Sequence, residues 1–274
     1  MYSKVKPGPT RRRSNVVKFT VSKPGEQEKF IAERSMSRYK MDTDDRLRRL
    51  SKEWLDLSLV HNYPHNFDWL GLPIIQYPQD IVAVQELVWK VRPSVIVETG
   101  VARGGSLVLS ASLLALLDLC FGQERGAVRR VLGIDIEIRD YNRLAIESHP
   151  LSGKINLLEG SSTSPETFEA VKNWVGESST TMVFLDSNHS YEHVYEELTL
   201  YSQLVTPGSY LVVFDTVVEH LSAQALGDRP WGPGNSPLTA VERFLNENPS
   251  FVVDRDLESK LQISVSPGGF LRKL

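Results

Sequence analysis

Short apolar runs rich in Val, Ile and Leu recur along the middle of the chain and alternate with segments of helical periodicity. Continuous runs without an alternating polar face are typical of parallel strands buried on both sides. Strands that alternate with helices predict an α/β fold whose parallel sheet is joined by right-handed crossovers. The expected strands span residues 94–98, 131–135, 155–160, 182–186 and 210–215, and the expected helices span 105–120, 140–148, 165–175 and 191–204.

Two further apolar runs follow, FVVD from residue 251 and LQISV from residue 261. They lie close enough in the chain to pair without a full helical crossover, as antiparallel strands do. We therefore expect an antiparallel strand at one edge of the otherwise parallel sheet.

A helix and an aromatic segment precede this alternating pattern. Residues 42–60 carry Leu and Trp at mostly helical spacing, which predicts an amphipathic helix capped by Asp42 or Thr43. The segment HNYPHNFDWLGLPIIQYPQD follows, and its aromatic side chains suit either a lid over a substrate or a seal on the core edge. Asp80 is the expected cap of a helix over 81–91.

Composition narrows the class of protein. The chain has 274 residues, of which 41% are hydrophobic and 24% charged, as in ordinary globular proteins. No apolar run reaches the roughly 18 to 20 residues that cross a bilayer, so we expect no membrane insertion. Cys120 is the only cysteine, so an internal disulfide and a thiolate zinc cluster are both excluded. A reducing, cytoplasmic location fits best.

Charge is distributed unevenly. Residues 1–49 carry 14 Lys and Arg against 6 Asp and Glu, while the remainder carries 17 against 28, which gives formal charges of +8 and −11. We expect a flexible basic arm over 1–25, a helical and aromatic extension over 26–78, and the main domain over 79–274. The arm lacks interleaved aromatic platforms, so no nucleic-acid partner is expected.

The strand ends, where ligands of open α/β sheets collect, are acidic in this sequence. Glu98 precedes a glycine-bearing turn with Gly100 and Gly104, and Asp135 ends the second run. The turn fails the G-x-G-x-x-G spacing of dinucleotide sites, and a carboxylate beside it repels phosphates. S-adenosylmethionine has a sulfonium, an ammonium and a ribose but no phosphate, so the acidic side chains at these strand ends would attract it. Asp135 is expected to accept from the ribose, and the remaining expected contacts are Ser106, Ser161 and Ser162.

The fourth and fifth runs end in Asp186 and Asp215. Neighbouring strand ends bring these carboxylates together in a site that suits Mg²⁺. His189 follows three residues after Asp186, and an imidazole can take a proton at neutral pH. We predict that His189 is the base that deprotonates a hydroxyl, which then attacks the methyl group. His193, one turn later, is expected to contact the substrate, to share this work or to orient its neighbour.

The segment from 219 to 239 is long and irregular, as lids and binding loops often are. Arg229 and Trp231 are candidates for holding a sugar ring, by hydrogen bonding and by stacking. A surface loop pinned by Trp231 is an equal alternative.

From about Asn66 to its end, the chain resembles the bacterial family called cephalosporin hydroxylase or rhamnosyl O-methyltransferase. The resemblance rests on WLGLPIIQYPQD, VETGVARGGS, GIDIEIRDYNR, FLDSNHSYEHV, VVFDT and DRPWGPGNSPLTAV. It implies a Rossmann-like class I methyltransferase fold with seven strands, the last reversed, and S-adenosylmethionine-dependent methylation of sugar hydroxyls. The resemblance implies that Glu98, Gly100, Gly104 and Asp135 contact the cofactor. It also implies that Asp186 and Asp215 hold Mg²⁺ and that His189 is the base.

One position departs from this resemblance. Related macrolide-sugar methyltransferases carry a Glu-Asp pair after the fifth run, whereas this chain has Phe214-Asp215. One metal ligand is therefore missing. Glu219, Thr216 or water is expected to fill the gap, or the site binds metal weakly or not at all.

Two other function classes stay open beside methyl transfer. A non-haem iron hydroxylase needs two histidines and a carboxylate, often in an H-x-[DE] motif on a β-barrel. None of the six histidines begins such a motif, and the alternation of strands and helices opposes a barrel. A non-catalytic cofactor-binding or assembly protein of the same fold is the second alternative, which Phe214 motivates.

The sequence thus predicts a cytoplasmic O-methyltransferase that uses S-adenosylmethionine, with Mg²⁺ as a second expected cofactor. The expected acceptor is a sugar of a surface polysaccharide such as lipopolysaccharide, of a glycolipid or of a glycosylated natural product. The helix at 42–60 and the aromatic segment offer surfaces for a homo-oligomer.

Overall fold

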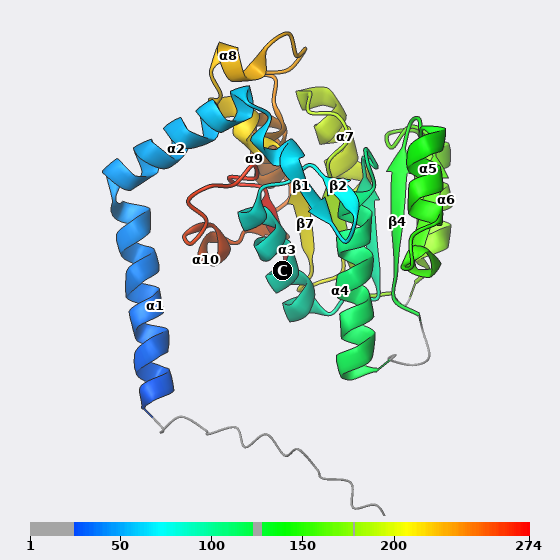
Figure 1. Ribbon diagram of the computed structural model, residues 1–274, viewed down its shortest axis with the longest axis horizontal. Helices are drawn as coiled ribbons and strands as arrows, with labels where there is room; N and C mark the ends of the chain where they lie inside the picture. Colours follow the sequence, from blue (N-terminus) through cyan, green and yellow to red (C-terminus); the bar gives the residue numbers. More distant parts are fainter. Residues whose placement is uncertain (1–24, 123–127, 178) are drawn as a thin grey trace, which may run out of the picture.

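A computed structural model describes residues 25–122, 128–177 and 179–274. They form a seven-stranded sheet with helices on both faces, and a separate two-stranded hairpin (Figure 1). The predicted α/β fold with a mostly parallel sheet and a reversed last strand is thereby confirmed. The basic arm predicted over 1–25 lies outside the described residues, apart from Gly25.

The strand order of the large sheet is β5-β4-β3-β6-β7-β9-β8. Pairing is parallel from β5 to β7, and β9 runs antiparallel to both of its neighbours. All five apolar runs of the alternating region become strands, as predicted. The strands are β3 (Val95–Thr99), β4 (Arg130–Asp135), β5 (Ile155–Glu159), β6 (Thr181–Leu185), β7 (Tyr210–Val213), β8 (Phe251–Val253) and β9 (Phe270–Lys273).

The last strand is not the one that the apolar pattern predicted. Residues 261–265 form no strand, and β9, at Phe270–Lys273, inserts between β7 and β8 instead. Polar groups of the predicted run are used elsewhere: Ser264 Oγ and the N–H of Val265 donate to the carboxylate of Asp80 at 2.6 and 3.0 Å. The run at 251 forms the edge strand β8, as predicted, but its antiparallel partner is β9 and not the run at 261.

Two hydrophobic layers cover the sheet. On β3, Ile96 packs in a layer with α3 and α4, whereas Val95 and Val97 pack in a second layer with α6, α7 and α9. Successive residues of a strand point to opposite faces, so an uninterrupted apolar run supplies both layers. The helices of the main body are α3 (Pro78–Val91), α4 (Gly105–Phe121), α5 (Asp140–Glu147), α6 (Pro165–Val175), α7 (Tyr191–Tyr201), α8 (Ala223–Leu226), α9 (Pro237–Glu247) and α10 (Arg255–Glu258), with 3-10 turns η3 (Ser152–Lys154) and η4 (Thr216–His220).

Two helices precede the main body. Helix α1 (Glu26–Thr43) buries no side chain and extends away from the sheet, and α2 (Asp45–Val60) lies against α8 (Figure 1). The cap of α2 is Asp44, whose carboxylate accepts from the N–H groups of Arg46 and Leu47 at 3.0 Å. The predicted helix was therefore found, but with neither Asp42 nor Thr43 as its cap, because both belong to α1.

The aromatic segment forms the 3-10 turn η1 (Tyr63–Asn66) and a hairpin of β1 (Phe67–Trp69) and β2 (Leu72–Ile74). Tyr63 packs edge-on against both Trp54 of α2 and Phe67, with ring centroids 5.1 and 5.2 Å apart, and Tyr77 is fully buried beside them. Trp69 donates to Ser112 Oγ of α4 at 3.1 Å. These side chains seal an edge of the core, one of the two alternatives predicted for this segment.

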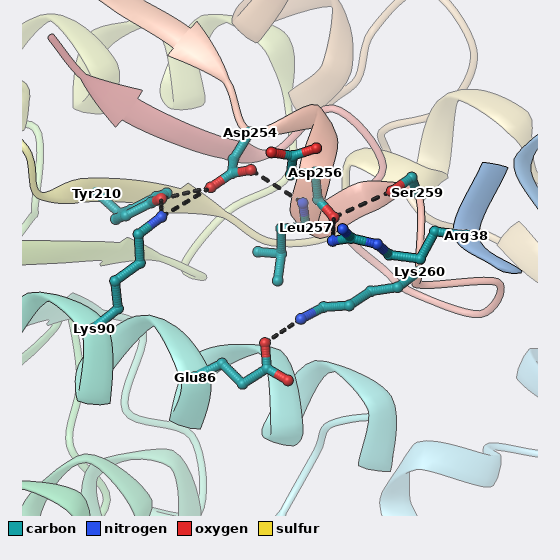
Figure 2. Close-up of polar contacts among 9 residues, drawn as sticks. All are labelled: Arg38, Glu86, Lys90, Tyr210, Asp254, Asp256, Leu257, Ser259 and Lys260. Carbon is teal, nitrogen blue, oxygen red and sulfur yellow. Dashed lines mark hydrogen bonds and ion pairs between the residues drawn. The ribbon is translucent and has the colours of Figure 1, made fainter. Parts of the chain in front are cut away.

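Helix α3 is joined to the C-terminal region by polar contacts. The Tyr210 hydroxyl donates to Asp254 Oδ2 at 2.5 Å and accepts from Lys90 of α3 at 2.8 Å, and Glu86 pairs with Lys260 (Figure 2). Asp80 is not the predicted helix cap. Tyr77 occupies that position, and the Asp80 carboxylate points from the first turn of α3 into the 264–265 segment.

Among the described residues, none of the helices combines the length and apolar character that a bilayer crossing requires.

Candidate active site

The carboxyl ends of β3, β4, β6 and β7 lie at one edge of the sheet because these strands are parallel neighbours. Ligands of open α/β sheets bind at this edge. The acidic residues that the sequence singled out end these strands or follow directly after them. The candidate site is therefore built on the loops at this edge.

The turn between β3 and α4 approaches other main chain so closely that a side chain would not fit. Gly100 has a φ of +89°, and a Cβ there would lie 2.1 Å from the main-chain oxygen of Asp186. Gly104 has a φ of +84°, and a Cβ on Gly105 would lie 2.3 Å from the oxygen of Pro73. Only glycine tolerates both conditions. The turn brings main-chain N–H groups to the N-terminus of α4, where a ligand can approach them.

Asp135 at the end of β4 turns its carboxylate toward this glycine turn. Oδ2 accepts from the N–H of Val101 at 2.9 Å, and Oδ1 accepts from the N–H of Glu137 at 3.3 Å. These bonds fix the turn and the carboxylate together. Each oxygen can accept a second bond, so the predicted contact to ribose hydroxyls is compatible with this geometry.

Glu98 is 2% exposed, and Ser110 of α4 lies 3.4 Å from its Oε2. Burial raises the pKa of Glu98 to about 7, although hydrogen bonds from Ser106 and Ser110 lower it. Among the described residues, no Lys, Arg or His forms an ion pair with this carboxylate. A cationic ligand would supply the charge that the buried carboxylate lacks.

Asp186, His189 and Asp215 come together beside the glycine turn. One ligand atom from each lies within 4.8 Å of the others. His189 Nε2 is 3.1 Å from Asp215 Oδ2. The sequence predicted that the two aspartates share a site with His189 beside them, and the strand order β6-β7 accounts for this proximity.

The carboxylate of Asp186 is held by a residue that precedes the large sheet in the chain. Gln76, in the loop between β2 and α3, donates from Nε2 to Asp186 Oδ2 at 3.1 Å. Burial, followed by the neighbouring charges of Asp215 and Glu98, raises the pKa of Asp186. A proton or a bound cation would relieve this repulsion.

Asp215 occupies the left-handed backbone region, with a φ of +54°. Non-glycine residues in this region are strained, and such strain clusters at functional sites. The preceding residue, Phe214, is 6% exposed and packs edge-on against Phe184 with centroids 6.2 Å apart. Phe214 thus contributes an apolar contact to the core.

Glu219 lies outside the cluster of potential ligands. Its carboxylate accepts from the N–H of Gly234 at 2.9 Å and from Ser236 Oγ at 2.6 Å. Ser236 is also the cap of α9, so these bonds fasten the 227–236 loop to η4. The expectation that Glu219 fills the missing metal position is not matched by this geometry, because its oxygens are committed to the loop.

His193 belongs to a polar network on α7. Its Nε2 lies 3.1 Å from Ser162 Oγ, 3.1 Å from Ser187 Oγ and 3.4 Å from the buried Glu197. Ser161, in contrast, pairs with the Thr163 hydroxyl at 3.2 Å. The network fastens the loop after β5 to the loop after β6, which fits a positioning role for His193. Its contact to a substrate stays a prediction.

The two loop residues expected to bind sugar have different surroundings. Arg229 is exposed and donates to the main-chain oxygens of Ala225 and Leu226 at 2.9 Å, which satisfies the end of α8. Trp231 packs edge-on against His189, with ring centroids 5.0 Å apart. Its Nε1 is buried without a partner among the described residues. Trp231 therefore borders the candidate site, whereas Arg229 supports the loop.

Buried atoms without partners indicate how well a cofactor would fit. Gln76 Oε1 and Thr99 Oγ1 are buried and have no hydrogen-bond partner among the described residues, and both lie near the glycine turn. Together with the glycine cradle and Glu98, they fit a polar cation such as S-adenosylmethionine. For Mg²⁺, Asp186 and Asp215 supply two oxygen ligands, but the third nearby group is an imidazole and Phe214 supplies none.

Sequence reasoning missed Gln76, Ser187 and Glu197. Gln76 lies in the block WLGLPIIQYPQD, which was interpreted through its aromatic residues alone. Glu197 stands four residues after His193 on a helix, a spacing that brings side chains together and was available in the sequence. No local pattern indicates that Gln76 reaches Asp186, because 110 residues separate them.

Comparisons with known proteins agree on one family. The model of the family described as Rhamnosyl O-methyltransferase/CmcI matches residues 61–274. A protein named Rhamnosyl O-methyltransferase from Mycobacterium leprae is 28% identical over 207 residues, which cover 74% of this chain and 81% of that protein. A protein of the same name from Mycobacterium tuberculosis is 27% identical over 205 residues, covering 74% and 76%.

Solved structures share the fold. A structure of CmcI with Mg and SAM covers 77% of this chain and 77% of its own, with 18% sequence identity and a TM-score of 0.51. An apo structure of CmcI gives the same coverage and TM-score at 20% identity. At these identities the likeness concerns the fold, which is the one described above.

Proposed function

The chain belongs to the Rhamnosyl O-methyltransferase/CmcI family, and on that premise we propose that it transfers the methyl group of S-adenosylmethionine to a sugar hydroxyl. The observation that carries this proposal is the convergence of Asp186, His189 and Asp215 beside the glycine turn. A methyltransferase that acts on a hydroxyl needs a cradle for the donor and a proton acceptor next to it, and this edge of the sheet offers both.

In the proposed reaction, His189 removes the hydroxyl proton as the sugar oxygen attacks the methyl carbon. A bond forms between that oxygen and the methyl carbon while the bond from carbon to sulfur breaks, and S-adenosylhomocysteine leaves. Asp215, 3.1 Å from His189 Nε2, orients the imidazole and stabilises the imidazolium that results. Trp231 limits the rotation of the ring through its edge-on contact.

Mg²⁺ is the second part of the proposal. Asp186 and Asp215 would hold the ion, which when bound would lower the pKa of the acceptor hydroxyl. Two carboxylates are enough for Mg²⁺ that keeps several waters, but Phe214 removes the ligand that related proteins supply. We therefore propose weak Mg²⁺ binding that assists His189 without replacing it.

The names of the mycobacterial relatives suggest a rhamnosyl acceptor. We propose a deoxysugar or sugar hydroxyl within a polysaccharide such as lipopolysaccharide, a glycolipid or a glycosylated natural product. Trp231 borders the reaction site and offers an aromatic face for the C–H groups of a sugar ring. The cytoplasmic location and a homo-oligomeric assembly stay predictions.

Two alternatives have less support. A hydroxylase of the facial-triad type needs two histidines and one carboxylate, whereas the cluster among the described residues has one histidine and two carboxylates. A non-catalytic binder of S-adenosylmethionine is motivated by Phe214. It would leave the contact between His189 and Asp215 without a role.

The proposal is tested by incubating the purified protein with S-adenosylmethionine and rhamnosyl or other glycosyl acceptors. The expected result is an acceptor heavier by one methylene unit and an equal amount of S-adenosylhomocysteine. Binding of S-adenosylmethionine without transfer to any acceptor would favour the non-catalytic alternative, and failure to bind it would contradict the proposal.

A further inference from the structure

The side-chain amide of Gln76 has one atom with a hydrogen-bond partner and one atom without. It is 6% exposed, and its Nε2 donates to Asp186 Oδ2 at 3.1 Å. Its Oε1 is buried and accepts no hydrogen bond among the described residues. Buried acceptors in folded proteins nearly always have a hydrogen-bond partner, so a donor is missing at this point. Because the amide nitrogen is committed to Asp186, the missing donor must come to the oxygen.

The surroundings of Gln76 locate that donor. Gln76 lines one cavity with the glycine turn, at Gly100–Gly105, and with Asp186. It also lines an adjoining cavity with Glu98 and Ser106. Both cavities belong to the part of the site in which the cofactor is proposed to bind. Gln76, with its unsatisfied oxygen, therefore lies beside the proposed cofactor region.

We propose that Gln76 Oε1 accepts a hydrogen bond from the α-ammonium group of S-adenosylmethionine. This inference rests on the proposed function. S-adenosylmethionine has three kinds of donor, which are the ammonium, the ribose hydroxyls and the adenine amino group. The ribose is predicted to lie at Asp135, on β4, so the adenosine half extends away from β6. The ammonium is the donor that remains near Asp186 and Glu98, where Gln76 lies.

Charge supports the same assignment. Glu98 lines the cavity that Gln76 borders, and its buried carboxylate has no cationic partner among the described side chains. An ammonium group in this region would be attracted by Glu98 and would donate to Gln76 Oε1. Because the same amide holds Asp186, binding of the amino-acid end of the cofactor would also fix the orientation of that carboxylate. Gln76 thus connects cofactor binding to the reaction site.

The proposal gives the segment before the main domain a role in the site. Pro73 of β2 lies so close to the glycine turn that a Cβ on Gly105 would contact its oxygen at 2.3 Å. Three residues later the chain delivers Gln76 to Asp186. The hairpin is therefore placed against the turn by main-chain packing, and the loop that follows it completes the cofactor site.

The test compares a ligand that has the amino-acid end and the sulfonium charge with a ligand that lacks both, and each ligand is compared between the wild type and the variants. Calorimetric titration of the full chain with S-adenosylmethionine and with 5′-methylthioadenosine, which lacks the ammonium and the carboxylate, measures the dissociation constant of each. For Gln76→Met and Gln76→Ala we expect the Kd of S-adenosylmethionine to rise roughly tenfold, the loss of one charge-assisted hydrogen bond. The Kd of methylthioadenosine should change less than twofold.

Controls separate this inference from the proposed function. Gln203→Met alters an exposed glutamine that lines neither cavity, and it should leave both constants unchanged. If the wild-type chain binds neither ligand, the proposed function fails. If the wild type binds both and the Gln76 variants bind S-adenosylmethionine normally, or lose both ligands equally, the inference about Gln76 is overturned. Thermal melting confirms that each variant is folded before it is titrated.

Discussion

His189 is held from two sides at the end of the sheet. Asp215 approaches its Nε2, and Trp231 packs edge-on against its ring. An imidazole fixed by a carboxylate and an aromatic wall keeps one orientation, which a general base requires. The strained backbone of Asp215 shows that the fold maintains this pairing at some cost in local conformational energy.

Replacing the base should affect turnover and spare cofactor binding. For His189→Ala we expect kcat to fall by about 100-fold or more, the usual contribution of a general base, because the hydroxyl keeps its proton. The Kd of S-adenosylmethionine should change less than twofold. Steady-state assays and calorimetry measure the two quantities. His65→Ala, at an exposed histidine, serves as the control, and an unchanged kcat for His189→Ala would remove His189 from the role of base.

The position of Phe214 allows the missing metal ligand to be restored. For Phe214→Glu we expect Mg²⁺ to bind roughly tenfold more tightly than in the wild type, since a third carboxylate joins Asp186 and Asp215. The gain should appear in calorimetric Mg²⁺ titration and as a larger rise of Tm with Mg²⁺. Phe214→Gln introduces a polar group without charge and should not show the gain. Equal Mg²⁺ affinity in all three proteins would refute the interpretation of this position.

Among single residues, the polar ones at the ends of strands could be identified from the sequence. Asp186, His189 and Asp215 were predictable as neighbours because parallel strands end at one edge. Glu219 was a reasonable candidate by its distance along the chain, but the commitment of its oxygens to Gly234 and Ser236 depends on how the loop folds. Gln76 reaches the site only through the docking of a distant hairpin, which local patterns do not specify.

The glycine turn and the β1–β2 hairpin depend on one another at the scale of elements. The turn has no side chains where it meets β2, so the two main chains pack directly. This contact sets the distance between the start of α4 and the loop that carries Gln76. The geometry of the proposed cofactor site therefore depends on two packed elements and not on the turn alone.

Adding one methyl group at this contact should separate the elements. For Gly105→Ala we expect the Kd of S-adenosylmethionine to rise by about tenfold or more and stability to fall by about 1–3 kcal/mol, because the new Cβ would overlap the Pro73 oxygen. Calorimetry and urea unfolding measure these effects. Gly153→Ala, where a Cβ would meet nothing within 4 Å, is the matched control. Normal binding and stability in Gly105→Ala would contradict the described packing.

Strands buried on both faces could be predicted from the sequence. A strand that depends on its pairing partners and a helix start that depends on its cap could not. The runs that became β3 to β7 are uninterrupted and apolar, so their identity does not depend on distant partners. Strand β9 is only four residues long and includes Arg272 and Lys273, and its pairing with β7 and β8 makes it a strand. The cap of α2 was misplaced because the preceding helix α1 has little amphipathic pattern to reveal it.

For the molecule as a whole, the same parallel topology that assembles the site brings carboxylates together at one edge. Glu98 is buried among apolar side chains of the core, and its ionised form is disfavoured there. A fold optimised for stability alone would not keep this carboxylate. The proposed binding of a cationic ligand would explain its presence, and stability and function would then be opposed at this position.

Because Glu98 is buried, its ionisation should make the free energy of unfolding depend on pH. The pKa of Glu98 is raised from 4.5 to about 7 in the folded chain, so the stability contributed by the protonated form is complete below 4.5 and is lost as pH rises through 7. Glu98→Gln should therefore be more stable than the wild type by about 3 kcal/mol at pH 8, with little difference near pH 4.5. It should also bind S-adenosylmethionine more weakly.

Urea unfolding of both proteins at pH 4.5 and 8 measures this effect. Glu196→Gln, at an exposed glutamate, should show no such pH-dependent gain. A difference between Glu98→Gln and the wild type that is the same at both pH values would show that ionisation of Glu98 does not limit stability.

The most direct measurement is a crystal structure of the chain grown with S-adenosylhomocysteine. We predict that the ribose hydroxyls contact Asp135, that the amino-acid end lies beside Glu98 and Gln76, and that the sulfur faces the space between Asp186 and His189. Electron density for the ligand elsewhere on the molecule, or none at this edge of the sheet under saturating conditions, would contradict it.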